Sequence, residues 1–200
     1  LGRLPALSLR EHITYVIFFP ALASGPIDRA ERFMPDLGAL PDISLFIPPR
    51  LIEAGGRIGM GLLKKFVLGD SLALFALNPT NAAQATSAGA LWLLLYAYAF
   101  RLYLDFSGYT DIVIGIGILL GIRLPENFDL PYLKQSITAF WQSWHITLSQ
   151  WVRFYVFMPL SRFLLMRKRK PSPTVLALVG QMTTMLVIGL WHGVTWGFVA

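Results

Sequence analysis

The chain of 200 residues contains no cysteine and few charged side chains. Without cysteine it can form neither disulfide bonds nor a cysteine-ligated zinc site, and it has no thiol for nucleophilic catalysis. Charged residues make up 14% of the chain, whereas hydrophobic residues make up 55% and the mean hydropathy is +0.57. Soluble domains usually carry about 25% charged residues. The composition therefore predicts a polytopic protein that is embedded in a membrane.

Acidic residues are scarcer than basic ones, 11 against 17, which gives a net charge of +6. The basic residues stand in short loops between apolar segments, an arrangement that argues against nucleic-acid binding. The densest cluster, Arg167-Lys168-Arg169-Lys170, precedes an uncharged stretch. The positive-inside rule predicts that this cluster faces the cytoplasm. A simple contact with lipid headgroups is the alternative interpretation, and both can hold together.

Common catalytic signatures are also missing, since the chain has no GxSxG, HExxH or P-loop motif. Histidine is rare, and two of the three histidines follow tryptophans in apolar sequence, as Trp144-His145 and Trp191-His192. A titratable group at membrane depth marks a functional site by default, and imidazole moves protons near neutral pH. The alternatives are an interfacial anchor for His145 and a satisfied packing histidine for His192.

The apolar segments predict an all-α protein with broken or re-entrant helices. Residues 13–27 are too short and too interrupted for a full span, and they favour a half-span or re-entrant turn. The next segments are predicted to be a proline-rich connection (29–49), a helix (51–77), a polar loop (80–87), a further loop (123–134), an amphipathic helix (136–165) and an uncharged membrane span (175–191). On the wheel of the amphipathic helix, His145 stands between an apolar and a polar side.

The longest apolar stretch covers residues 89–122. As one helix it would be about 50 Å long, against ~30 Å for the hydrocarbon core, so we expect a break at Ser107-Gly108. Gly117 and Gly121 have the GxxxG spacing that permits close helix packing. Arg101 and Asp105 are four residues apart and are predicted to pair on one helical face.

A polar island interrupts this stretch. It consists of Asp105, Ser107, Tyr109, Thr110 and Asp111. Such an island usually satisfies a buried loop, and lining a polar path is the alternative.

Five segments, in the same order, resemble the membrane-bound O-acyltransferase family. They are residues 18–27 (FFPALASGPI), 105–111 (DFSGYTD), 124–128 (LPENF), 140–149 (FWQSWHITLS) and 190–193 (LWHG). The similarity is to the bacterial polysaccharide-modifying branch, which includes alginate O-acetyltransferases and the membrane protein that moves D-alanine onto teichoic acid. One departure is Arg153-Phe154-Tyr155, where the family often has Arg-Asp-Tyr, so that a carboxylate partner for Arg153 is in doubt.

The resemblance implies a buried active-site funnel with His192 as the essential histidine and His145 as the second characteristic one. Further residues are expected to line the substrate path or support the site: Trp144, Trp191, Asp105, Ser107, Tyr109, Asp111, Asn127, Ser149 and Arg153. Acyl transfer to an alcohol needs a base that takes the hydroxyl proton, and histidine can serve as that base.

We therefore interpret residues 1–200 as an internal fragment of one such domain, in a multi-pass protein of the bacterial cytoplasmic (inner) membrane. Its predicted reaction moves an acetyl or similar short acyl group to hydroxyls of an exported polysaccharide. The donor is expected to be an acyl thioester, such as acetyl-CoA or an acylated carrier protein, and no bound cofactor or metal is predicted. Besides membrane lipid, a periplasmic or extracellular acyltransferase is a candidate partner. A transporter with a histidine-lined path is the alternative, and direct and relayed transfer both stay open.

Overall fold

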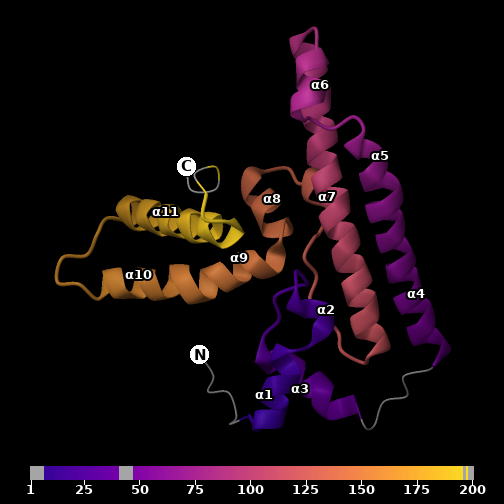
Figure 1. Ribbon diagram of the computed structural model, residues 1–200. Helices are drawn as coiled ribbons and strands as arrows, with labels where there is room; N and C mark the ends of the chain where they lie inside the picture. The colour runs from indigo at the N-terminus through magenta and orange to yellow at the C-terminus, as the bar shows by residue number, and fades with distance from the viewer. Residues whose placement is uncertain (1–6, 41–46, 196, 198–200) are drawn as a thin grey trace. The chain divides into compact units, whose positions relative to one another are not determined.

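A computed structural model describes residues 7–40, 47–195 and 197 of the chain (Figure 1). The regular elements of the described part are helices, and two residues form an isolated β-bridge. The prediction of an all-α protein is therefore confirmed. The chain divides into two compact units, residues 1–127 and residues 128–200, which we describe in turn.

The first unit opens with three short helices, α1 (Leu9–Val16), α2 (Phe19–Leu22) and α3 (Ala30–Ala39). Ser8 starts α1 through a capping box with Glu11, in which the Ser8 amide donates to the Glu11 carboxylate at 2.8 Å. Because α1 and α2 are both short, residues 13–27 do not form one continuous span, as the sequence predicts.

Helix α3 corrects the expectation of an irregular connection over residues 29–49, of which 41–46 lie outside the described residues. Pro35 lies inside this helix and does not end it, although a proline removes one backbone donor and crowds the carbonyl four residues earlier. Helical spacing places Ala30, Phe33 and Leu37 on one face, and Phe33 is fully buried in the core of the unit. Burial of that face stabilises a helix that the proline alone would disfavour.

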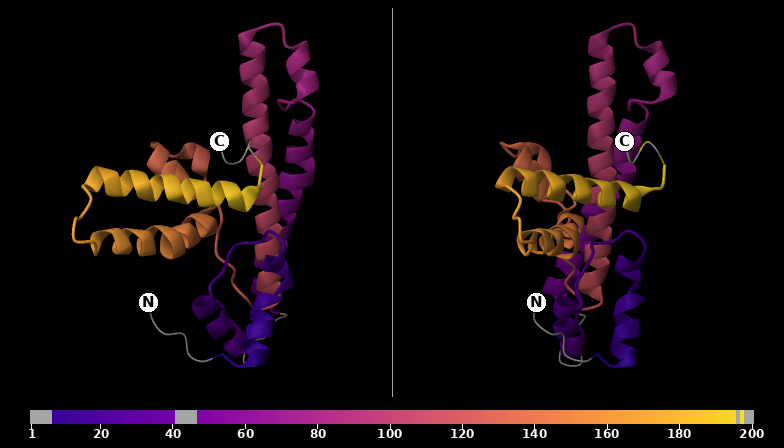
Figure 2. Two further views of the ribbon diagram at one scale, coloured as in Figure 1. Left: turned by 60° about the vertical axis from the view of Figure 1, so that its left-hand side comes forward. Right: turned by 90° about the vertical axis from the view of Figure 1, so that its left-hand side faces the viewer.

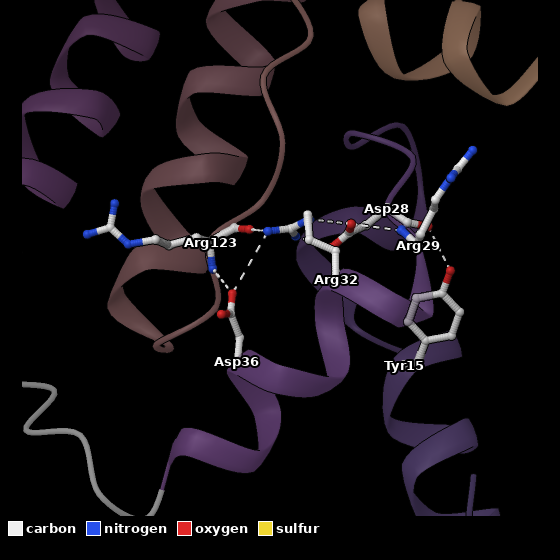
Figure 3. Close-up of polar contacts among 6 residues, drawn as sticks. All are labelled: Tyr15, Asp28, Arg29, Arg32, Asp36 and Arg123. Carbon is white, nitrogen blue, oxygen red and sulfur yellow. Dashed lines mark hydrogen bonds and ion pairs between the residues drawn. The ribbon is translucent and has the colours of Figure 1, made fainter. Parts of the chain in front are cut away.

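Polar contacts attach α3 to the segment that follows α7 (Ala88–Leu119), as Figure 3 shows. The Arg123 amide donates to the Asp36 carboxylate at 2.8 Å, and Arg32 donates to the Arg123 carbonyl. The other end of α3 is held by Asp28, which accepts from Arg32 Nε at 2.6 Å. The Tyr15 hydroxyl donates to the Asp28 carbonyl at 2.7 Å and so ties α1 to the same contact.

The largest element of the first unit is a pair of long helices that pack against each other and lie side by side in Figure 1 and in the left view of Figure 2. One is α7, and the other runs continuously through α4 (Pro48–Leu62), the π-helical segment η2 (Leu63–Gly69) and α5 (Asp70–Ala73). This second helix confirms the prediction for residues 51–77, apart from its boundaries. The predicted loop 80–87 is partly wrong, because α6 (Pro79–Gln84) begins there.

Helix α6 forms because both residues at its start favour a helix. The Asn78 side chain accepts from the Asn81 amide at 2.8 Å, and Pro79 occupies the first turn, where its missing N–H costs nothing.

Helix α7 is unbroken over 32 residues, so the predicted break at Ser107-Gly108 is wrong. Gly108 serves a close helix contact instead. A Cβ atom on Gly108 would lie 2.8 Å from the Gly61 carbonyl oxygen, and one on Gly61 would lie 2.5 Å from the Gly108 carbonyl oxygen. The same relation recurs one heptad on, where a Cβ on Gly115 would lie 2.9 Å from the Ala54 carbonyl oxygen. Gly108 and Gly115 therefore bring the two backbones together rather than form a hinge.

The end of α7 gives Gly121 a different role from the one its GxxxG spacing predicts. Gly121 has a φ of 83°, a conformation that glycine adopts without steric cost. The Ile122 amide donates to the Gly117 carbonyl at 2.9 Å and the Gly121 amide to the Ile118 carbonyl at 3.0 Å. These two bonds form a Schellman motif, so Gly121 closes the helix.

The described residues of the second unit form a 3₁₀ turn and five helical segments. They are η3 (Pro131–Leu133), α8 (Ile137–Ser143), α9 (Ile146–Val152), the π-helical η4 (Arg153–Phe157), α10 (Met158–Leu165) and α11 (Pro173–His192). The segment from α9 to α10 packs against α11 as a hairpin, in which a Cβ on Gly180 would lie 2.4 Å from the Phe157 ring. Helix α11 confirms the predicted apolar segment 175–191, and α7 and α11 are both long and apolar enough to cross a membrane.

We expect Gly108→Ala to destabilise the full-length protein, because the added methyl group would separate α4 from α7. Overpacking of this kind costs about 1–3 kcal/mol, which would appear as a lower melting temperature in detergent. Gly89→Ala is the matched control on the same helix, since its Cβ would meet only Ser87 Oγ, at 3.9 Å. Equal melting temperatures for the two variants would contradict the close contact.

The turn between α10 and α11 should face the cytoplasm, as the positive-inside rule predicts for residues 167–170. We place the reporter at Lys170→Cys, because Ser172 caps α11 by accepting from the Val175 amide at 3.3 Å. In an otherwise cysteine-free full-length protein, this thiol should resist an impermeant maleimide in intact cells and react with a permeant one. Rapid labelling by the impermeant reagent would reverse the orientation.

Candidate active site

The first candidate histidine stands at a break between two helices. Helix α8 ends at Ser143 and α9 begins at Ile146, with His145 at φ 44° and ψ 55°. The predicted continuous helix over 136–165 is therefore wrong at this point, and so is the position of His145 on its wheel. Left-handed backbone is uncommon for residues other than glycine, and it clusters at functional sites. No glycine or proline marks the break in the sequence.

Aromatic packing holds the break in place. Trp144 forms an antiparallel bridge with Phe128, and the two rings meet edge to face at 5.1 Å between centroids. On another side the Trp144 ring stacks on Phe140 at 5.7 Å. The Asp129 amide donates to the Ser143 carbonyl at 3.0 Å and fastens the preceding loop to the end of α8. Trp144 thus has an anchoring role. Its partners Phe128 and Phe140 were not among the predicted site residues, although both lie in the motifs 124–128 and 140–149.

One indole ring, that of Trp191, connects the two candidate histidines. His145 contacts Trp191 with 5.9 Å between ring centroids and 62° between planes. Trp191 contacts His192 with 4.9 Å between centroids and 88° between planes. Two segments that are far apart in the chain therefore bring both imidazoles against one indole ring.

The two histidines differ in environment. His145 is 7% exposed, and burial lowers its pKa from 6.5 to about 4, with a further lowering by the charge of nearby His192. At neutral pH the His145 imidazole is therefore uncharged.

His192 ends α11 and is exposed in this chain, whereas the sequence predicts a buried position. The difference follows from its place at the end of the helix. Its Nδ1 lies 2.8 Å from the Ile188 carbonyl oxygen. Because a carbonyl only accepts, Nδ1 carries the hydrogen, and the lone pair of the neutral ring is on Nε2. That tautomer suits a base.

The remaining residues that were predicted for the site near the histidine motifs are Ser149, Arg153 and Asn127. Ser149 Oγ donates to the Trp144 carbonyl at 3.5 Å, and the Ser149 amide donates to the His145 carbonyl at 3.1 Å, so Ser149 spans the break. Arg153 begins η4 and is exposed, and it forms no ion pair among the residues that the structure describes. Asn127 is fully buried at the end of the first unit.

In the first unit the polar island forms ion pairs between helices. Asp105 pairs with Lys65, so the predicted pair with Arg101 is wrong. Asp111, which is 5% exposed, pairs through one oxygen with Lys64 at 2.7 Å and through the other with Arg57. We name these contacts the ion-pair ladder. Its basic partners on α4 and η2 were not among the predicted site residues, although their charges inside the predicted helix 51–77 were a signal.

The remaining island residues pack beside the ladder. Ser107 is buried, and its carbonyl accepts from the Thr110 hydroxyl at 2.9 Å, while Tyr109 packs against the hydrophobic core. A role of Asp105, Ser107, Tyr109 and Asp111 in a substrate path stays a prediction. Among the described residues, no group of three or more histidine, aspartate or glutamate side chains could hold a metal ion.

Comparison with known proteins places these features in a family. The chain is 36% identical over its full length to a teichoic acid D-alanyltransferase of Streptococcus thermophilus, of which it covers 49%. It is 36% identical over 99% of its length to a probable alginate O-acetylase of Azotobacter vinelandii, covering 38% of that protein. A peptidoglycan O-acetyltransferase of Helicobacter pylori is 35% identical over 94% of the chain, which covers 34% of it.

The chain thus spans about a third to a half of the length of these curated relatives. The model of the membrane-bound O-acyltransferase family matches residues 4–200, which is nearly the whole sequence. The resemblance that five separate motifs indicate is confirmed by a match that includes all of them. The chain belongs to the membrane-bound O-acyltransferase family.

Proposed function

We propose that this chain carries the histidine centre of a membrane O-acyltransferase that transfers an acetyl or similar short acyl group to a hydroxyl of an exported polysaccharide. The observation that carries the proposal is the contact of His145 and His192 with the same Trp191 ring, from separate helical segments. Relatives named for alginate, teichoic acid and peptidoglycan support an acceptor of the cell-envelope polymer class.

In this proposal His192 is the general base. Its Nε2 takes the proton of the acceptor hydroxyl as the oxygen forms a bond to the acyl carbonyl carbon. The bond from that carbon to the donor breaks, and the leaving group takes the bonding electrons and receives the proton from His192. The hydrogen bond from Nδ1 to the Ile188 carbonyl supports this role, because it fixes the tautomer and orients the ring.

His145 acts as the neutral partner of this base. A second imidazolium beside His192 would oppose protonation of the base, and burial of His145 prevents that charge from forming at neutral pH. An uncharged imidazole can still donate one hydrogen bond to the donor or the acceptor. The left-handed backbone at His145 and the aromatic anchoring of Trp144 support a fixed position for this ring.

The acyl donor in this proposal is a thioester, such as acetyl-CoA or an acylated carrier protein. We also propose that the full-length protein crosses the bacterial inner membrane several times. A periplasmic or extracellular acyltransferase is the partner that would act after a relayed transfer. The transporter alternative has less support, because the relatives above are all named as acyl-transferring enzymes. A donor-dependent acylation assay on the full-length protein separates the two, since a transporter leaves its substrate chemically unchanged.

His192→Ala should abolish detectable acylation in the full-length protein while the protein still inserts and accumulates. Loss of a general base typically lowers the rate about 10²- to 10⁴-fold. His145→Ala should retain more turnover, because orientation is less demanding than proton transfer. His12→Ala is the control, since His12 lies on α1, outside both histidine motifs. Near-normal acylation by folded His192→Ala protein would contradict the assignment.

We expect the folded protein to become less stable as the pH falls, because protonation of the buried His145 is unfavourable. Its folded pKa of about 4 lies below the ordinary value of 6.5, so the unfolded chain binds the proton more tightly. The stability that neutral His145 contributes is complete above pH 6.5 and is lost as the pH falls toward 4. The melting temperature of the parent should therefore fall more steeply over this range than that of His145→Gln. Parallel curves would mean that His145 is not buried in its neutral form.

A further inference from the structure

The whole net charge of the chain lies in its second unit. Residues 128–200 contain seven lysine and arginine residues and one acidic residue, a surplus of six that equals the +6 of the complete chain. The acidic residue, Asp129, is paired with Lys134 at 2.6 Å. No carboxylate side chain of this unit is therefore left to neutralise the arginine and lysine residues that follow.

Most of this charge gathers at one end of the helical hairpin. We name residues 162–170 the basic tip; it comprises the last turn of α10 and part of the turn that leads to α11. Arg167, Lys168, Arg169 and Lys170 are all exposed. Exposed apolar side chains stand beside them, with Phe163 at 58% and Met166 at 81% exposure. The Arg167 guanidinium lies 4.9 Å from the centre of the Phe163 ring, so charge and apolar surface form one patch.

The basic tip also lies at the end of a candidate membrane span. Ser172 caps α11, which begins at Pro173 directly after the tip. At ~1.5 Å per residue, the 20 residues of α11 match the ~30 Å thickness of a hydrocarbon core. Only Gly180 and Gly189 are buried along α11, so its surface is available to lipid. When α11 crosses the bilayer, the basic tip lies at the depth of the headgroups.

We propose that the basic tip binds the headgroups of anionic phospholipids. The guanidinium groups of Arg167 and Arg169 match the phosphodiester in charge and geometry, and Lys168 and Lys170 add charge. Phe163 and Met166 enter the boundary between headgroups and acyl chains, where exposed apolar side chains are stable. An acidic protein could also bind the positive charge of the basic tip. Binding of such a protein would not explain why the tip lies at the end of a candidate membrane span. This proposal does not rest on the acyl-transfer function.

The test uses the full-length protein in a non-ionic detergent and measures phosphatidylglycerol and phosphatidylcholine binding by native mass spectrometry. The variant is Arg167→Gln/Arg169→Gln. The matched control is Arg10→Gln/Arg101→Gln, which removes two exposed arginines from the first unit. A basic residue near an anionic surface changes affinity roughly fivefold, so the tip variant should bind phosphatidylglycerol about 25-fold more weakly. The control variant should match the parent, and phosphatidylcholine should bind all three proteins equally.

Two results would overturn the proposal. An equal loss of phosphatidylglycerol binding in both double variants would mean that overall charge, rather than the basic tip, attracts the lipid. Unchanged phosphatidylglycerol binding in the tip variant would exclude a lipid site at the tip. In that second case, loss of poly-L-glutamate binding by the same variant would identify an acidic protein as the occupant.

Discussion

A polar side chain in apolar surroundings is stable only where a partner reaches it, and this constraint organises both units of the chain. In the first unit it brings Asp111, on the long helix α7, to Lys64 and Arg57 of the neighbouring helix. The contact of Gly61 with Gly108 lets the two backbones approach closely enough for these short ion pairs. A buried carboxylate without a cationic partner would lower the stability of the folded protein here, whereas a carboxylate with two cationic partners holds two helices together.

In the second unit the same constraint acts on the histidines. The His192 ring donates to a carbonyl of its own helix, and the buried His145 avoids the cost of a charge by staying neutral. The position of His145 has its own cost, since left-handed backbone at a residue with a side chain is unfavourable by about 1–3 kcal/mol. The stacked and edge-to-face rings around Trp144 offset this cost next to the break. The aromatic residues of this unit therefore hold the two histidines in position.

Charged side chains are distributed differently in the two units of the chain. Residues 1–127 contain equal numbers of acidic and basic side chains, and several of their ion pairs, such as Asp105–Lys65, lie between helices. Residues 128–200 hold the surplus of positive charge, which gathers at the end of a hairpin opposite to the end that holds His192. One unit thus uses charge for internal cohesion, and the other presents it to its surroundings.

The sequence by itself determined the helical class, the apolar segment that becomes α11, the family and the two histidine motifs. These features are local, because composition, caps such as Ser172 and short motifs report on neighbouring residues. Only the tertiary structure decided that α7 continues through Gly108, that Asp105 pairs with Lys65, and that the chain breaks at His145. Each of these outcomes depends on a partner distant in sequence: a facing glycine, a lysine on another helix, or an aromatic ring from a preceding loop. Periodicity along one segment contains no information about such partners, because their approach is set by how the helices pack.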